Sequence, residues 1–188
     1  MDAARLKKAI VDSARTVESL GAQAGAIAAI CRTIIASLRA GGKVLTAGHG
    51  GSAAESLHMA QEFVGRFRNN RVSLPAVALV ADATALTCIG NDFGFDRLFS
   101  RQVEGLGRRG DVLVLLSTSG NALNLKHALE AAQAKGMKVV CLLGKGGGAL
   151  AGLGDHEIVV QGMATEHIQE AHQVVIHLIL DAVEEAYG

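Results

Sequence analysis

The chain has 188 residues, a formal net charge of zero at neutral pH, and 49% hydrophobic residues of which few are aromatic. This length is enough for one domain with an aliphatic core, so a single domain over residues 1–188 is predicted. Balanced charge gives no general attraction to nucleic acid or to an anionic membrane, and neither partner is expected. No signal peptide or membrane-spanning run is expected, and Cys31, Cys88 and Cys141 are predicted to be reduced core thiols of a cytoplasmic protein.

Two amphipathic helices are predicted before the first strand. Apolar residues recur at helical spacing over residues 3–20 and 24–39, and Gly41-Gly42 ends the second helix. A minimal doubly wound domain does not need two leading helices. Residues 1–40 are therefore expected either to cover the sheet or to pack on a partner chain, with residues 41–188 as the core.

From residue 41 the chain alternates between short apolar runs and helical segments. Strands are predicted at 43–47, 76–80, 112–116, 138–143 and 157–160, and helices over 52–66, 82–91, 96–106, 122–135 and 165–186. The segment 90–95 is expected to be a polar and aromatic loop, and the basic segment 67–71 a solvated turn. Continuous apolar strands between helices predict an α/β fold, a three-layer αβα sandwich with a five-stranded parallel sheet of flavodoxin-like type.

A glycine-rich turn, Gly48-His49-Gly50-Gly51-Ser52, connects the first predicted strand of the sheet to a helix. Glycines let backbone N–H groups approach a ligand, and the first helical turn offers unpaired donors. Ser52 can cap this helix and can also donate its hydroxyl hydrogen. The pattern is neither the Walker nor the dinucleotide fingerprint, so it indicates either an anion site or an ordinary tight turn.

A second junction of the same kind follows the third strand. Ser117-Thr118-Ser119-Gly120-Asn121 places three hydroxyls before a helix, which suits a phosphate or sugar oxygens, or helix capping alone. The carboxyl ends of parallel strands share one edge of the sheet. Both junctions are therefore expected on one rim, and the presence of two favours a binding site.

His58 and Glu62 lie four residues apart on the helix after the glycine turn. That spacing places both side chains on one helix face, as a metal or acid–base pair or as a simple surface pair. The last helix carries further polar residues. Gln173 and His177 are the easier local pair, because Gln169 lies about 12 Å along the axis from His177. His177 stands among apolar residues, so a histidine buried in the core is the alternative.

Three stretches together resemble a known family. They are AGHGGSAAESLHMAQEFVGRF, LPAVALVADATALTCIGNDFGFDRLFSRQVEGLGRRGDVLVLLSTSGN and HIQEAHQVVIHLI. Over nearly the whole chain the sequence resembles the sugar isomerase (SIS) domain family and, within it, the phosphoheptose isomerase family. The resemblance implies an aldose–ketose isomerase that converts D-sedoheptulose 7-phosphate to D-glycero-D-manno-heptose 7-phosphate through an enediol. It also implies a role at the first step of ADP- or GDP-heptose biosynthesis, as for lipopolysaccharide, and a cytoplasmic homotetramer with active sites at subunit interfaces.

The resemblance also implies functional residues. It implies one zinc ion per subunit, with Glu62 and His177 as the acid–base pair, and it selects Gln169 where spacing alone favours Gln173. The implied zinc ligands are His58, Glu62, Gln169 and His177. The implied substrate-binding residues are His49, Gly50, Gly51, Ser52, Glu62, Asn91, Asp92, Ser117, Thr118, Ser119 and Gln169.

Two positions depart from the family pattern. His49 stands where the family usually has Asn, and Ala122 stands where it usually has Ser. Imidazole is larger and titrates near neutrality, and Ala122 removes one hydroxyl from the implied phosphate site. Two alternative functions stay open. One is a non-catalytic SIS protein that associates with the bacterial replication initiator, and the other is an isomerase of another sugar phosphate.

Overall fold

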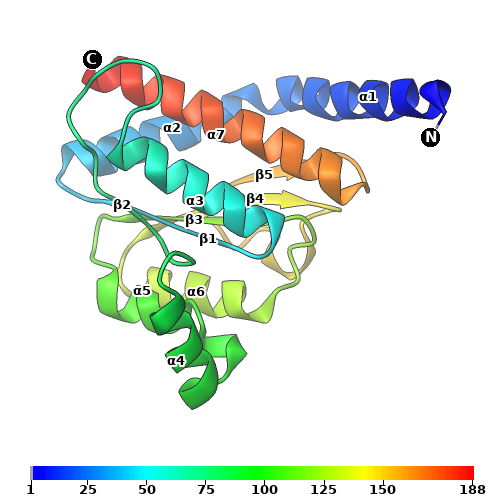
Figure 1. The fold of residues 1–188 in the computed structure, drawn as a ribbon. Coiled ribbons are helices and arrows are strands. Elements are labelled where there is room, and N and C mark those ends of the chain that lie inside the picture. The colour runs from blue at the N-terminus through cyan, green and yellow to red at the C-terminus, as the bar shows by residue number, and fades with distance from the viewer. Residues whose placement is uncertain (1) are drawn as a thin grey trace.

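The computed structural model describes residues 2–188, and the predicted fold class is confirmed. Five parallel strands form one sheet in the order β2-β1-β3-β4-β5 (Figure 1). The strands are β1 (Val44–Gly48), β2 (Ala76–Ala78), β3 (Val112–Ser117), β4 (Lys138–Gly144) and β5 (His156–Val160). β2 is shorter than predicted, because the chain turns after Ala78, whose carbonyl accepts a hydrogen bond from the N–H of Ala81.

Helices cover both faces of the sheet (Figure 1). One layer contains α2 (Ala24–Arg39), α3 (Gly51–Val64) and α7 (Thr165–Tyr187), and the other contains α5 (Ser100–Leu106) and α6 (Leu123–Ala134). Successive residues of β3 point to opposite layers. Val112 and Val114 join the core under α2, α3 and α7, whereas Leu113 and Leu115 join the core under α5 and α6. Burial on both faces explains why the strands are continuously apolar.

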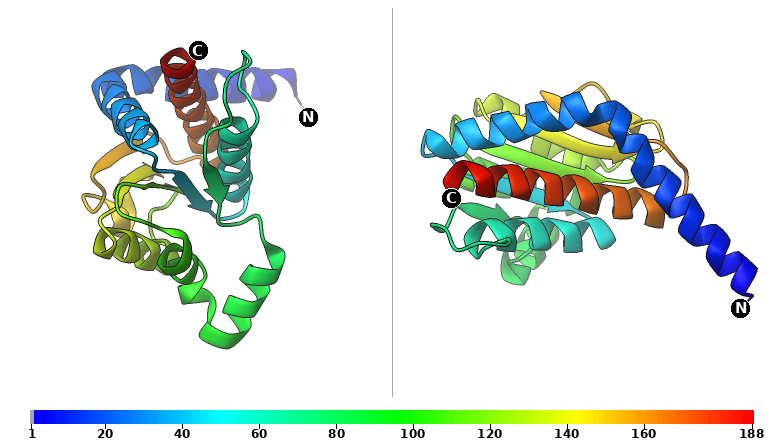
Figure 2. Two further views of the ribbon diagram at one scale, coloured as in Figure 1. Left: turned by 90° about the vertical axis from the view of Figure 1, so that its left-hand side faces the viewer. Right: turned by 90° about the horizontal axis from the view of Figure 1, so that it is seen from above.

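The two N-terminal helices have different surroundings. α2 packs on the sheet and on α7, but α1 (Ala3–Glu18) has no buried residue and extends away from the body (Figure 2). A 3₁₀ turn (Ser19–Gln23) joins them, so the predicted first helix ends two residues early. Leu6 and Ile10 remain 48% and 70% exposed. Covering the sheet therefore accounts for α2, while the apolar face of α1 is open in the single chain.

α4 (Ala83–Phe93) projects from the body as an arm on the other side of the sheet (Figures 1 and 2). Asp82 caps its start by accepting hydrogen bonds from the N–H groups of Thr84 and Ala85, and Gly94 ends it with a φ of 84°. The predicted loop over 90–95 is therefore wrong at its start, since residues 90–93 continue the helix.

Two further predictions need correction. Cys31 and Cys141 are buried, but Cys88 lies exposed on α4 and is not a core thiol. By length and composition alone, the stretch Ala3–Arg39 is long and apolar enough to cross a membrane, contrary to the prediction. Within that stretch, Ile30 and Ile34 of α2 have no exposed surface and belong to the core with α7.

Candidate active site

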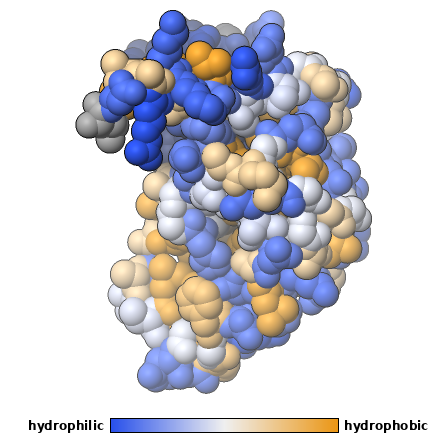
Figure 3. Space-filling model, turned by 90° about the vertical axis from the view of Figure 1, so that its right-hand side faces the viewer, coloured by the Kyte–Doolittle hydropathy of each residue, from blue (hydrophilic) through white to orange (hydrophobic). Residues whose placement is uncertain are grey.

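The two polar junctions meet at one edge of the sheet. β1 and β3 are paired neighbours with Gly48 opposite Leu116, so the turns that follow them lie side by side. Figure 3 views the molecule from the side where the strands end, and the surface there is mixed, with polar residues between scattered apolar ones. A pocket of about 360 Å³ opens between the turns. Its lining residues are His49, Gly50, Gly51, Ser52, Leu116, Ser117, Thr118, Ser119, Ala122, Thr165 and Gln169.

The glycine turn (Gly48–Ser52) requires glycine at positions 48 and 51, because a Cβ atom there would collide with neighbouring atoms. A Cβ on Gly48 would lie 2.6 Å from the carbonyl oxygen of Ser52, and a Cβ on Gly51 would lie 2.3 Å from Nε2 of Gln169. Gly50 adopts a φ of 56°, which favours glycine. Gly51 thus lets the Gln169 side chain of α7 lie against the turn, and this contact brings α7 to the pocket.

The serine turn (Ser117–Asn121) is held by its own hydroxyl groups. Ser117 Oγ accepts a hydrogen bond from the N–H of Gly120 at 2.9 Å, and Ser119 Oγ accepts one from Asn121 at 3.3 Å. Each hydroxyl keeps its hydrogen for donation to a ligand. Ala122 is the N-cap of α6 and makes no side-chain cap. The first N–H groups of α6 are therefore open to an anion.

His49 is fixed by a link that the sequence did not reveal. The side-chain amide of Asn124, which is 2% exposed, donates to the carbonyl of Phe95, so its Oδ1 faces His49 Nε2 at 2.7 Å. His49 Nε2 therefore donates this hydrogen bond. The imidazole also lies 5.5 Å from the ring of Phe95 and 5.2 Å from that of Phe99. The link joins the glycine turn, α6 and the segment after α4, and no local motif in the sequence predicts such a long-range pair.

A second group of polar side chains, here called the histidine cluster, consists of His58 and Glu62 on α3 with Gln173 and His177 on α7. The Nε2 atoms of His58 and His177 lie 3.3 Å apart, and Gln173 Nε2 lies 2.8 Å from the same His177 atom. Glu62 Oε2 is buried and has no hydrogen-bond partner. Two groups therefore share one nitrogen of His177 while a nearby carboxylate oxygen is unpaired.

His177 is exposed, so the core-histidine alternative is wrong for this residue. Partial burial of the imidazole, and then the neighbouring His58 imidazole, lowers the pKa of His177 below its usual value, although Glu62 acts in the opposite direction. The buried histidine of α7 is His172, whose Nε2 lies 3.0 Å from the carbonyl oxygen of Leu143. Burial lowers the pKa of His172 to about 4.

The histidine cluster fits a divalent metal ion in the chemistry of its donors. Two nitrogen ligands of a tetrahedral zinc ion are separated by roughly 3.3 Å, which is the distance between the His58 and His177 nitrogens. The unpaired Glu62 oxygen supplies a third donor type that zinc accepts. Within residues 2–188, however, the structure gathers no group of three or more His, Cys, Asp or Glu side chains around one metal position. Gln173 lies at His177, while Gln169 lies against the glycine turn.

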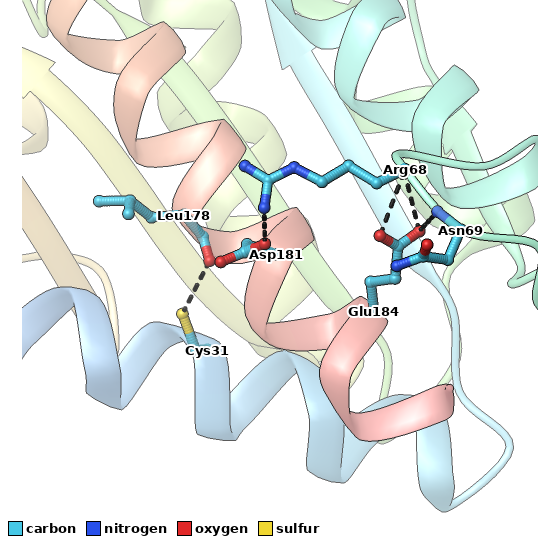
Figure 4. Close-up of polar contacts among 6 residues, drawn as sticks. All are labelled: Cys31, Arg68, Asn69, Leu178, Asp181 and Glu184. Carbon is cyan, nitrogen blue, oxygen red and sulfur yellow. Dashed lines mark hydrogen bonds and ion pairs between the residues drawn. The ribbon is translucent and has the colours of Figure 1, made fainter.

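The basic segment after α3 is largely exposed, as predicted for a solvated turn, and it is also anchored to α7 (Figure 4). Arg68 pairs with Asp181, and the buried carboxylate of Glu184 accepts hydrogen bonds from the N–H groups of Arg68 and Asn69. Although burial alone would raise it, these backbone hydrogen bonds lower the pKa of Glu184. The segment thereby fixes the C-terminal half of α7 against α3, and with it the position of His177.

Asn91 and Asp92 are not brought to the pocket of their own chain. Both are exposed at the end of the projecting α4, where Asn91 Nδ2 donates to Asp92 Oδ1 at 2.7 Å. Of the predicted substrate-binding residues, the structure gathers His49, Gly50, Gly51, Ser52, Ser117, Thr118, Ser119 and Gln169 at the pocket. Glu62 lies ten residues beyond Ser52 along α3, about three helical turns, in the histidine cluster.

Comparisons with known proteins identify the family of the chain. Residues 10–144 match the SIS domain family, and the chain belongs to that family. Within it the chain is similar to phosphoheptose isomerases. It is 44% identical over 184 residues to the phosphoheptose isomerase of Akkermansia muciniphila, covering 97% of each chain. It is 50% identical over 167 residues to that of Rhodospirillum rubrum, covering 89% of each.

Solved structures show the same similarity. The phosphoheptose isomerase of Neisseria gonorrhoeae superposes with a TM-score of 0.89 at 38% identity, covering 96% of this chain and 97% of that one. The phosphoheptose isomerase of Francisella tularensis gives a TM-score of 0.91 at 33% identity, covering 98% of this chain and 100% of that one. The similarity includes the N-terminal helices, because it covers nearly the whole chain.

Proposed function

We propose that the chain is an aldose–ketose isomerase that interconverts D-sedoheptulose 7-phosphate and D-glycero-D-manno-heptose 7-phosphate. The observation that carries the proposal is a pocket between two helix N-termini, lined by hydroxyls and backbone donors and joined through α7 to an acid–base cluster. The similarity to phosphoheptose isomerases over nearly the whole chain supports the choice of substrate.

The reaction moves a proton between C1 and C2 of the sugar. Glu62 would take the proton from C1 of the ketose, since its buried Oε2 has no hydrogen-bond partner in this structure, and would deliver a proton to C2 after exchange with solvent. His177 would exchange protons with the oxygens on C1 and C2. One proton leaves C1 and one arrives at C2, so the enediol forms and collapses to the aldose without any other reactant.

The phosphate would lie between the two turns. Ser117, Thr118 and Ser119 offer hydroxyl hydrogens, and the open first turn of α6 offers backbone N–H donors. The site can therefore bind an anion through direct hydrogen bonds. Gly50, Gly51 and Ser52 would approach it from the opposite side of the pocket. The sugar chain would then extend along α3 and α7 toward the histidine cluster.

We propose a zinc ion as the cofactor, held by His58, Glu62, Gln169 and His177. The spacing of the two histidine nitrogens and the unpaired carboxylate oxygen support zinc binding at the cluster. When bound, zinc supplies Lewis-acid stabilisation of negative charge that develops on oxygen. In this structure the amide of Gln173, and not that of Gln169, lies beside His177. Gln169 would therefore have to change its side-chain conformation to serve as the ligand.

We also propose a cytoplasmic homotetramer in which a neighbouring subunit completes each active site, in a pathway of heptose biosynthesis. Two observations support it. Asn91 and Asp92 project on α4 away from their own pocket, where they could orient the sugar hydroxyls of another subunit's substrate. An open apolar groove of about 850 Å³ runs between α2 and α7, with Leu20, Ile27 and Leu178 among its lining residues.

The test is NMR of sedoheptulose 7-phosphate with the purified protein, once with added zinc and once after chelation, with metal analysis of both samples. Aldose signals that appear with zinc and disappear after chelation are expected. Aldose in both samples would retain the isomerase and remove the zinc proposal. Aldose in neither sample would contradict the proposed reaction and favour another sugar phosphate or a binding role with the replication initiator.

A further inference from the structure

The pocket has no permanent positive charge in its lining. Its residues include no lysine or arginine, although a sugar phosphate carries close to two negative charges at pH 7. One cation lies at the edge. Lys145 Nζ donates to Thr165 Oγ1 at 2.9 Å, and Thr165 is itself a lining residue. The exposed ammonium group of Lys145 therefore contacts a side chain that lines the pocket.

The loop that carries Lys145 is fixed against the serine turn. A Cβ on Gly120 would lie 1.8 Å from the carbonyl oxygen of Gly147, and Asn121 Oδ1 accepts a hydrogen bond from the N–H of Ala149. The N–H of Leu150 also donates to the carbonyl of Gly120. These contacts hold the loop and the serine turn as one unit, so the backbone of Lys145 has a defined place at the rim.

Lys145 adopts a left-handed backbone conformation, which favours glycine over lysine. Its φ of 49° is the only positive φ of a non-glycine residue within 2–188, and glycines occupy both neighbouring positions. Its ammonium group also lies at Thr165, the first residue of α7, where the helix end carries partial positive charge. Glu166 offsets part of that charge. A phosphate bound in the pocket would remove the remaining repulsion.

We propose that Lys145 binds the phosphate group of the substrate and gives the pocket its preference for phosphorylated over neutral sugars. The inference rests on the proposed function for the identity of the sugar, but the binding of phosphate can be measured without turnover. A charged hydrogen bond at an exposed rim strengthens binding of a dianion, and binding that is equal in the ground and transition states changes KM and leaves kcat largely unaltered.

The test compares Lys145→Asn with Lys145→Arg and with a matched control, Lys135→Asn, at the far end of α6. Asparagine tolerates the left-handed backbone and removes the charge. Inorganic phosphate and sedoheptulose 7-phosphate are titrated by calorimetry into each full-length protein at low and at high salt, and KM and kcat are measured in parallel. Circular dichroism verifies that each variant is folded.

Lys145→Asn is expected to weaken binding of both probes about tenfold and to reduce the salt dependence, with the arginine variant within about threefold of wild type. Equal binding by Lys145→Asn and Lys135→Asn would overturn the inference, as would a wild-type protein that binds neither probe. Phosphate binding that depends on Lys145 in a protein without turnover would retain the inference and overturn the proposed reaction. Turnover without any effect of Lys145 would do the reverse.

Discussion

The serine turn and the pair of helices α3 and α7 satisfy their polar groups to different extents. In the serine turn, Ser117 and Ser119 accept backbone hydrogen bonds, and the adjoining His49 and Asn124 pair with each other. On the helices, buried oxygens of Glu55 and Glu62 and the Nδ1 atom of His172 have no partner. A satisfied region is rigid before the ligand arrives, whereas unpaired buried groups are costly and are expected where a ligand or proton is to be received.

The largest effect is expected on the unpaired side of this comparison. Glu62→Gln keeps the size of the side chain and removes the base, so kcat should fall about 1,000-fold with the fold intact. This kcat is measured by NMR of the aldose in samples quenched at successive times. Glu130→Gln on the exposed side of α6 is the matched control. A Glu62→Gln variant with wild-type kcat would rule out Glu62 as the base.

The rigid side can be broken at Gly120, which has a φ of 65° and would place a Cβ 1.8 Å from the backbone oxygen of Gly147. Gly120→Ala should lower the free energy of unfolding by at least about 3 kcal/mol, because two backbone segments must separate. Gly146→Ala is the control: its φ is 79° and the space around it is open, so only the conformational cost of about 1 kcal/mol applies. Urea denaturation measures both. Equal losses would show that the two loops are not held together.

Glu55 tests the cost of an unpaired buried carboxylate. Burial raises its pKa from 4.5 to about 7, and the Ser52 hydroxyl one turn away, which makes no hydrogen bond to the carboxylate, opposes this shift only in part. Burial disfavours the charged carboxylate, so the folded state favours protonated Glu55. The contribution of this protonation to the free energy of unfolding is fully present below pH 4.5 and is lost as the pH rises to about 7. Glu55→Gln should match wild type at pH 4.5 and exceed it by up to about 3 kcal/mol in unfolding free energy above pH 7.

Urea denaturation at several pH values measures the effect of Glu55→Gln. The wild-type profile also contains the opposite contribution of His172, whose pKa is lowered to about 4, and taking the difference between the two proteins at each pH cancels it. A difference that does not change with pH would mean that Glu55 finds a partner in the folded protein.

The smallest effect is expected at His49, on the satisfied side. His49→Asn loses the ring contacts to Phe95 and Phe99, so the unfolding free energy should fall by about 1 kcal/mol, with turnover within about threefold of wild type. His49→Ala also leaves the buried Asn124 Oδ1 unpaired and should lose about 2 kcal/mol. Turnover reduced a hundredfold in His49→Asn would instead give the imidazole a direct role in the reaction.

Much of the architecture and of the rim could be predicted from the sequence. Continuous apolar strands between helices predicted the buried parallel sheet, and the shared edge of parallel strands brought both turns to one rim. The side-chain link between His49 and Asn124 could not be predicted, because it joins residues 75 positions apart without any periodic signal.

Two of the three histidines of α7, His172 and His177, show a signal that was available in the sequence. His172 has apolar residues four positions away on both sides, Ile168 and Ile176, whereas His177 has Gln173 and Asp181. Residues four apart share a helix face, so this pattern predicts the burial of His172 and the exposure of His177, as observed. Immediate neighbours in the sequence, which lie on other faces, gave the wrong expectation.

The central claim is that Glu62 on α3 and His177 on α7 carry out proton transfer on a sugar phosphate held at the rim. Its most direct test is NMR of sedoheptulose 7-phosphate in D₂O with zinc-supplied wild type and Glu62→Gln. The account predicts that wild type forms the aldose with solvent deuterium at C2, and that Glu62→Gln binds the sugar phosphate without forming aldose. Equal aldose formation by both proteins, or none by wild type, would contradict it.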